Sequence, residues 1–343
     1  MSATVRDVAK KAGVSPSTVS RVLSGAVPVR EELRARVMGA VAELHYQYRP
    51  LGASPSGAAS IGIIVPKSSG SDFLAHPTIY SIFSAFVDEL SNRGIGNSVL
   101  LVDKEHLSHI ETLFGPRHDG YLIIGTNEEE EDRLMPYLLE NGIPHMIVNR
   151  WMNEKYMNYI NVDDVTASYG ATQHLISLGH RDIAFIGGNR NFRNTSLRLI
   201  GYKNAMAEAG LPVPPAYIHY GLYTEAFGYE VADAVLSLPA RPTAAFFCSD
   251  MIAIGFQKRC RERGIPLPSG LAMVGYGNTP LASYVRPPLT TVEMPAEVMG
   301  RQAAHALLNL VENPAVARVQ ILLKAPLIIR ESCGAPLMRP QGT

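Results

Sequence analysis

Short, almost continuous apolar runs alternate with helix-like segments from Ser60 onward, and this alternation limits the fold of most of the chain. The runs are SIGIIVP, SVLLV, DGYLIIG and PHMIVN; after an extended stretch ending in INVDD the pattern resumes with DIAFIGG, IHYG, AAFFCS and AMVGY. Strands that are apolar throughout are buried on both faces, and strands alternating with helices form parallel sheets. The sequence therefore predicts two similar α/β lobes. Helices of the second lobe are expected at Ala167–Leu178, Arg198–Ala209, Glu225–Leu236 and Met251–Arg263.

The first 50 residues differ from the rest in charge and in pattern. Of 31 basic and 31 acidic residues, eight basic and four acidic lie in this segment, so it carries +4 and the remainder −4. Apolar residues at helical spacing predict a helix ending at Gly13, a second helix opened by Ser15 and Pro16 and ending near Gly25, and a third from about Glu31 to His45. We expect an all-α headpiece around one small core.

The spacing of the first two predicted helices is that of a helix-turn-helix. The second helix would expose Ser17, Thr18, Ser20 and Arg21, whose hydroxyls and guanidinium suit phosphates and guanine edges. An ordinary helical hairpin with a solvated basic face is the alternative. The combined pattern favours DNA binding.

The run TVRDVAKKAGVSPSTVSRVLSG resembles the N-terminal signature of the LacI/GalR family of bacterial transcription regulators. The resemblance continues through HLISLGHRDIAFIGG, SLRLIGYKNAMAEAGL, SDMIAIG, AMVGY and RPPLTTVEMP. It implies a repressor whose second helix enters the major groove of a pseudo-palindromic operator, with Pro16, Ser17 and Arg21 at bases and Ser15 and Thr18 at phosphates. DNA contacts are expected at Thr4, Ser15, Pro16, Ser17, Thr18, Ser20 and Arg21.

The resemblance also implies a domain organisation. It places a headpiece at 1–48, a linker at 49–60, one lobe at 61–160 plus 292–323 and the other at 161–291 plus 324–332. The body would be similar to periplasmic sugar-binding proteins, cross three times between its lobes and form a homodimer. The closing run SCGAPLMRPQGT is too short and proline-rich for a heptad tail, which also favours a dimer.

Two positions depart from the family pattern. Arg30 stands where relatives usually have a serine that caps the third helix. In the linker, Gly52, Pro55 and Gly57 oppose the short hinge helix that relatives form on operator DNA, and Pro55 occupies the place of its leucine. We therefore expect a flexible tether.

Ligands of parallel sheets collect beyond the carboxyl ends of the strands, so a small effector is expected between the lobes. Arg198 matches a family arginine that contacts effector, although an ion pair is the alternative, and Asp250 has helix capping as its alternative. Gly277 stands where many relatives have an aspartate that grips ligand hydroxyls, and the loss of this carboxylate beside retained arginines favours an acidic or phosphorylated ligand such as a sugar acid. The effector is therefore expected to be a sugar or a sugar acid. The candidate effector residues are His76, Asn149, Arg150, Arg198, Tyr223, Ser249, Asp250 and Asn278.

Other functions have weaker support in the sequence. No signal-peptide core or membrane-length apolar run occurs, so a cytoplasmic location is expected. The three cysteines, and the histidine pairs His106/His109 and His174/His180, do not form a metal pattern, and GYGNTP lacks the third glycine of a dinucleotide fingerprint. We expect no metal, no cofactor and no catalytic residues. A solute-binding receptor and a nicotinamide-dependent enzyme remain as alternatives.

Overall fold

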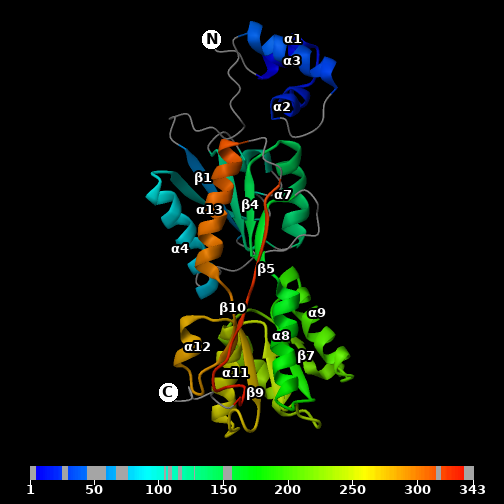
Figure 1. Ribbon diagram of the computed structural model, residues 1–343, viewed down its shortest axis with the longest axis vertical. Coiled ribbons are helices and arrows are strands. Elements are labelled where there is room, and N and C mark those ends of the chain that lie inside the picture. The colour runs from blue at the N-terminus through cyan, green and yellow to red at the C-terminus, as the bar shows by residue number, and fades with distance from the viewer. Residues whose placement is uncertain are drawn as a thin grey trace, which may run out of the picture. The chain divides into compact units, whose positions relative to one another are not determined.

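The computed structural model describes residues 5–24, 30–44, 59–66, 76–103, 106, 110–114, 118–126, 128–149, 157–313 and 318–335 (Figure 1). The chain divides into two compact units, Met1–Ile160 with Glu297–Ile321 and Asn161–Ala296 with Leu322–Thr343. It therefore passes from one unit to the other three times. The linker residues Gly52, Pro55 and Gly57 lie outside the described residues.

Three short helices form the headpiece, as the sequence predicts. They are α1 (Val5–Ala12), α2 (Pro16–Ser24) and α3 (Glu31–Glu43). Between α1 and α2 the chain turns at Gly13, whose φ of +65° favours glycine. The buried core of the headpiece consists of Val8, Ala9, Ala12, Val19, Val22, Val37 and Ala40.

Two arginines lie at ends of headpiece helices: Arg30 at the start of α3, and Arg36 of α3 at the end of α1. Arg30 takes the N-cap position of α3, and its side chain makes no capping hydrogen bond, which confirms the missing cap. Arg36 instead donates from Nη2 to the carbonyl oxygen of Ala12 over 2.6 Å. Because the last carbonyl groups of a helix have no partner within it, Arg36 closes the end of α1.

The first unit contains a sheet of six strands in the order β11-β5-β4-β3-β1-β2. Neighbouring strands pair in parallel from β5 through β4, β3 and β1 to β2. Helices α4 and α13 lie side by side, since a β-carbon on Gly300 would meet the carbonyl oxygen of Ile82 (Figure 1). The elements are β1 (Ser60–Pro66), α4 (Pro77–Asn92), β2 (Gly96–Val102), α6 (Ile110–Leu113), β3 (Gly120–Ile124), α7 (Glu128–Glu140), β4 (His145–Val148), β5 (Tyr159–Val162), α13 (Ala296–Glu312) and β11 (Gln320–Leu323).

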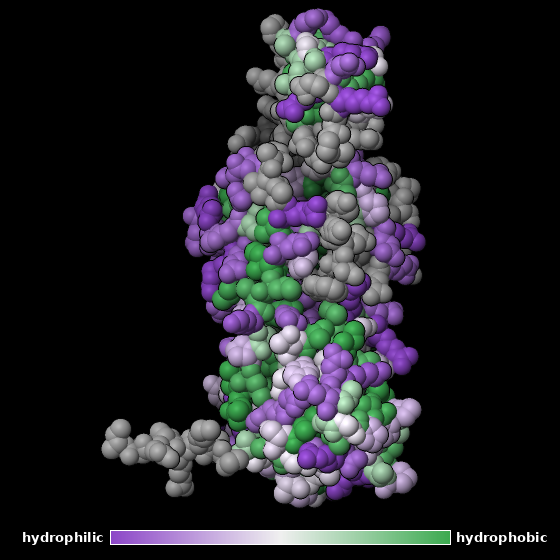
Figure 2. Space-filling view, turned by 45° about the vertical axis from the view of Figure 1, so that its right-hand side comes forward, coloured by the Kyte–Doolittle hydropathy of each residue, from purple (hydrophilic) through white to green (hydrophobic). Residues whose placement is uncertain are grey.

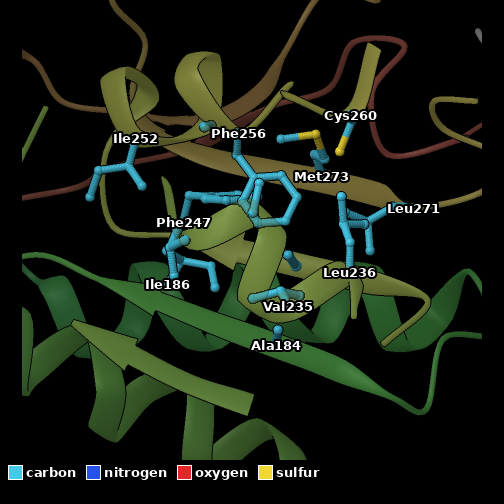
Figure 3. Close-up of a cluster of buried hydrophobic side chains, with 14 of the residues drawn as sticks. Ala184, Ile186, Val235, Leu236, Phe247, Ile252, Phe256, Cys260, Leu271 and Met273 are labelled. Atoms are coloured by element: carbon cyan, nitrogen blue, oxygen red, sulfur yellow. The ribbon is translucent and has the colours of Figure 1, made fainter. Parts of the chain in front are cut away.

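The second unit repeats this plan with the strand order β12-β10-β9-β8-β6-β7. Strand β6 is apolar throughout because both of its faces are covered. Ile186 packs in the core beneath α10 and α11 (Figure 3). The ring centroid of Phe185 lies 5.4 Å from that of Tyr202 on α9. The elements are α8 (Asp164–Ser177), β6 (Ile183–Gly187), α9 (Arg193–Glu208), η3 (Pro215–Tyr217), β7 (Ile218–Tyr220), α10 (Glu225–Leu236), β8 (Ala244–Phe247), α11 (Asp250–Glu262), β9 (Ala272–Gly277), α12 (Pro280–Tyr284), β10 (Thr290–Glu293) and β12 (Leu327–Ile328).

Most predicted elements are confirmed, and the predicted starts of two helices are wrong. Helix α8 begins at Asp164 rather than at Ala167, because Asp163 takes its N-cap position. Helix α9 begins at Arg193 rather than at Arg198, because Phe192 takes its N-cap position and Asn194 and Thr195 are buried in its first turn. Arg198 therefore lies on the second turn. Among the described residues, no helix is both long enough and apolar enough to span a bilayer.

Candidate functional site

The start of α2 forms the candidate nucleic-acid interface of the headpiece. The Oγ of Ser15 accepts a hydrogen bond from the backbone N–H of Thr18 over 3.1 Å, and the two hydroxyl oxygens lie 2.8 Å apart. This confirms Ser15 as the residue that caps the helix. Pro16 is exposed and Thr18 half-buried, whereas Val19 and Val22 lie in the core. Thus Val19 and Val22 of α2 hold the headpiece together, while Ser15 and Pro16 at the start of the helix are exposed.

The remaining predicted DNA contacts are only partly described. The backbone of α2 includes Ser17, Ser20 and Arg21, whose side chains are not described, and Thr4 lies outside the described residues. Exposed cations nearby include Lys10 on α1 and Arg34 on α3, while Lys11 forms an ion pair with Glu43. Exposed acidic residues are also present at Asp7 and Glu32, so among the described residues basic side chains outnumber acidic ones by a small margin, which favours an anionic partner.

A buried cluster around Arg198 forms the candidate ligand site at the carboxyl edge of the second sheet. Its Nε donates to Oδ1 of Asp164 over 2.7 Å, and Nη1 donates to the carbonyl oxygen of Cys248, also over 2.7 Å. The guanidinium carbon lies 3.7 Å from the ring centroid of Tyr276, whose hydroxyl donates to the same Asp164 oxygen over 2.7 Å. Three elements, α8, α9 and β9, thereby meet at one ion pair.

The electrostatics of this cluster follow from its burial. Burial lowers the pKa of the Arg198 guanidinium, but the adjacent Asp164 carboxylate more than offsets this, so the pKa lies above its usual value. Burial and the same carboxylate raise the pKa of the Tyr276 hydroxyl well above its usual value. Burial raises the pKa of the Cys248 thiol to about 12. Arg198 therefore stays charged, and the tyrosine and the cysteine stay neutral.

Ser249 and Asp250 begin α11, and the structure separates their roles. Ser249 is the N-cap, and its Oγ accepts from the backbone N–H of Met251 over 3.1 Å. Asp250 accepts from the backbone N–H of Thr279 over 2.7 Å and from the hydroxyl of Thr291 over 2.5 Å. The alternative that Asp250 caps its own helix is therefore wrong. Its carboxylate instead joins the start of α11 to the loop after β9 and to β10.

Asn278 follows β9 and has a φ of +50°. Its Oδ1 accepts from Nη2 of Arg330 over 2.6 Å, and its Nδ2 donates to Oε1 of Glu293 over 3.4 Å. Arg330 also donates to the carbonyl oxygen of Leu289 over 2.7 Å. Gly277 itself carries no carboxylate, but Glu293 of β10 places one at the same edge of the sheet.

Tyr223 lies beside the Arg198 cluster, as the strand-end rule predicts. Its hydroxyl and that of Thr195 are 2.6 Å apart, its ring centroid is 6.1 Å from that of Phe192, and burial raises its pKa to about 12. The structure thus brings together Arg198, Tyr223, Ser249, Asp250 and Asn278 within the second unit.

Three predicted residues belong to the first unit. His76 is the N-cap residue of α4 and is half-buried. Asn149 follows β4, is half-buried and has a φ of +61°. Arg150 lies outside the described residues. These residues remain predictions as ligand contacts.

Sequence reasoning missed four residues of this edge, namely Asp164, Tyr276, Glu293 and Arg330. Asp164 follows β5 by two positions, so the strand-end rule that selected Asn149 and Asn278 was sufficient to find it. Glu293 ends β10, so the same rule also selects it. No local signal marks Arg330, because it meets Asn278 only through the fold. Among the described residues, no group of three or more His, Cys, Asp or Glu side chains could hold a metal ion.

Comparison with known families gives two matches that together span both parts of the chain. Residues 4–48 match the bacterial regulatory proteins of the lacI family, and residues 172–333 match the periplasmic binding protein-like domain. The first match covers the three headpiece helices. The second covers most of the unit that holds Arg198.

Individual relatives span nearly the whole chain. The ribose operon repressor of Haemophilus influenzae is 32% identical and covers 96% of this chain and 98% of its own length. A complex of the transcriptional regulator CelR with cellobiose has a TM-score of 0.73 at 28% identity, covering 96% of this chain and 99% of the other. The lac repressor dimer bound to operator and an anti-inducer has a TM-score of 0.71 at 25% identity, covering 97% and 99%. These relatives are regulators, which confirms the prediction of a regulator rather than an enzyme.

Proposed function

The chain belongs to the lacI family of bacterial regulatory proteins, and from this premise we propose that it represses transcription by binding an operator through α1–α3 and responding to a sugar-type effector. The observation that carries the proposal is the order of its parts. A capped helix-turn-helix of residues 5–24 precedes a periplasmic-binding-protein-like body with a buried Arg198 cluster. One part suits DNA, and the other suits a small polar ligand.

DNA recognition is assigned to the exposed face of α2. Pro16 and Ser17 would lie at base edges, Arg21 would contact a guanine, and Ser15 and Thr18 would hold the backbone phosphates. Because α2 begins at Pro16, the positive end of its helix dipole would lie near the proposed phosphates. Thr4 and Ser20 complete the proposed contacts.

A homodimer is proposed because a pseudo-palindromic operator needs two headpieces. Exposed apolar side chains in each unit support this. In the second unit Tyr284 is 76% exposed and Leu281 46%, and in the first unit Leu101 is 52% exposed. Figure 2 shows hydrophobic residues gathered in patches on the surface of the described chain. Tyr284→Arg is expected to weaken the dimer, as measured by analytical ultracentrifugation.

The effector is proposed to bind at the carboxyl edge of the second sheet, near Arg198, Tyr223 and Asn278. Its binding would change the affinity of the headpiece for DNA, which is a coupling between two sites. We retain the headpiece at 1–48, the linker at 49–60 and the two lobes as the proposed domains. Since its DNA would lie in the cytoplasm, we propose that location.

Selection of random duplexes with the full-length protein tests the DNA-binding proposal. We expect enrichment of a short inverted repeat, with affinity falling steeply as salt rises. Arg21→Ala should weaken binding to that repeat by about 1–3 kcal/mol, roughly 5- to 150-fold. Arg34→Ala is the matched control, since it removes the same charge from the headpiece but not from α2.

Two results would contradict this proposal. The first is the absence of any enriched sequence from a folded, dimeric protein. The second is an equal loss of affinity in Arg21→Ala and Arg34→Ala, because that result would indicate a general charge effect rather than recognition by α2. Adding effector to the operator complex then tests regulation by the change in bound fraction.

A further inference from the structure

Asp164 is placed as the internal counter-ion of the arginine in the proposed ligand site. It is the first residue of α8, and its side chain is fully buried. Its Oδ1 accepts from both Arg198 and Tyr276, and its Oδ2 accepts from Nδ2 of Asn161 over 3.4 Å. A carboxylate at a helix N-terminus is further stabilised by the helix dipole. The negative charge of Asp164 is thus held fixed beside Arg198.

This pairing changes what Arg198 offers to a ligand. The positive charge that would attract a carboxylate or phosphate is opposed by a negative charge within 2.7 Å. Asp164 does not use up the hydrogen-bonding capacity of Arg198, because the bonds to Asp164 and to the Cys248 carbonyl involve one N–H of Nε and one of Nη1. A guanidinium has five N–H donors, and these two hydrogen bonds use two of them. Uncharged hydroxyl groups can accept the others.

An anion would also have to compete with Asp164 itself. If the ligand displaced this carboxylate from Arg198, Asp164 would remain buried without its cation and would keep, among the described residues, Tyr276 and Asn161 as donors. A buried carboxylate without its cation is strongly destabilised. The bound anion would therefore gain one ion pair at the expense of another.

Other charges at this edge do not compensate. Arg330 is bonded to Asn278 and to the Leu289 carbonyl, and its charge acts on the Asp250 carboxylate. The Glu293 carboxylate is bonded to the same Asn278 side chain. Arg190 is exposed and stacks on Tyr220 at the end of β7, where solvent screens its charge. Among the described side chains around the cluster, carboxylates therefore balance the cations.

We propose that Asp164 is a specificity-determining residue, which neutralises Arg198 and thereby restricts this site to uncharged polyhydroxy ligands and excludes sugar acids and sugar phosphates. This inference rests on the proposed function, because it assumes that the effector binds beside Arg198. The residue proposed to select the charge of the ligand is thus the first residue of α8, and it is not among the effector residues that the sequence predicts.

The test compares matched neutral and anionic sugars on the full-length protein by calorimetry and thermal shift. The pairs are galactose with galacturonate and glucose with glucuronate, and inorganic phosphate is a further anion. Asp164→Asn keeps the shape and removes the charge, while Asp164→Glu keeps the charge. Asp163→Asn is the matched control, because Asp163 is the exposed N-cap one residue earlier and asparagine also caps helices well.

We expect the wild type and Asp163→Asn to favour the neutral member of any pair they bind. Asp164→Asn should shift the ratio of affinities toward the anion by about tenfold or more, and Asp164→Glu should restore much of the wild-type preference. A merely structural role for Asp164 would weaken both members equally. Equal ratios in the wild type and in Asp164→Asn would overturn the inference.

If Asp164→Asn does not fold, the affinities of the wild type for the neutral and anionic sugars still test the inference. Tighter binding of the anionic member by the wild type would overturn the inference without any variant. If the wild type binds none of these sugars, the sugar part of the proposed function fails. The inference would then stand only if phosphate or an uronate stabilises Asp164→Asn and leaves the wild type unchanged. Selection of operator DNA tests the regulator independently.

Discussion

Substitution of Gly201 by alanine tests whether the close packing of α8 and α9 positions the Arg198 cluster. A β-carbon at Gly201 would lie 2.3 Å from the carbonyl oxygen of Val165 and 2.8 Å from the amide nitrogen of Tyr169, both on α8. The obstacle is backbone, so no side-chain rotation can relieve it. The helices must move apart, and they carry Asp164 and Arg198 respectively.

The magnitude follows from two opposing effects. Alanine is favoured over glycine inside a helix by about 1 kcal/mol. Overpacking usually costs about 1–3 kcal/mol, and a backbone obstacle places this site toward the upper end. We therefore expect the free energy of unfolding to fall by about 1–2 kcal/mol, which corresponds to a Tm lower by roughly 2–8 °C for a unit of this size.

Gly170→Ala is the matched control for this prediction. Gly170 is exposed on α8, and a β-carbon there would meet no atom within 4 Å. Stability should therefore rise by up to about 1 kcal/mol. Urea unfolding followed by circular dichroism measures both variants, and calorimetry measures their affinity for a ligand of the wild type. If Gly201→Ala is as stable as Gly170→Ala and binds ligand normally, the reasoning about this helix contact is wrong.

Three further predictions concern the headpiece and the pH dependence. Arg30→Ser should stabilise the headpiece by about 0.5–1 kcal/mol in thermal melts, because it supplies the missing cap of α3. Arg36→Met should destabilise it by about 1–2 kcal/mol through loss of the bond to the Ala12 carbonyl, and hydrogen exchange should show fraying at the end of α1. Burial lowers the pKa of the His145 imidazole below its usual value, so on acidification the unfolded chain takes up a proton before the folded chain does. The free energy of unfolding should therefore fall as the pH drops below about 6.5. His145→Gln should reduce this pH dependence, as measured by urea unfolding at several pH values.

Local patterns predicted those elements whose residues carry a clear period. Helix α10 has the predicted bounds, Glu225–Leu236, and β6 and β8 coincide with the apolar runs around Phe185 and Phe246. The start of α9 was not predicted, because the polar run NRNFRNTS resembles a loop although Asn194 and Thr195 are buried. Strand β12 has only two residues, too few for any period to be visible.

The candidate site was predictable one residue at a time but not as a set of contacts. Arg198 could be named from its place in the sequence, but its partner Asp164 lies 34 residues earlier, and Tyr276 lies 112 residues after Asp164. Such distances in sequence are closed only by the strand order of the sheet. The missing aspartate at Gly277 suggested an anionic ligand, whereas the buried pair of Arg198 and Asp164 favours a neutral one. The pair is the stronger argument, because it acts on the group that would bind the anion.

The position of Asp164 also connects the proposed ligand site with the first passage of the chain between its units. That passage lies between Ile160 and Asn161, and Asn161 donates to the Asp164 carboxylate. A ligand that takes hydrogen bonds from Arg198 changes the charge felt by Asp164, and Asp164 holds both the start of α8 and the segment that enters the unit. The Arg198–Asp164 pair, proposed to select the ligand, is therefore tied to one of the three chain segments that join the units.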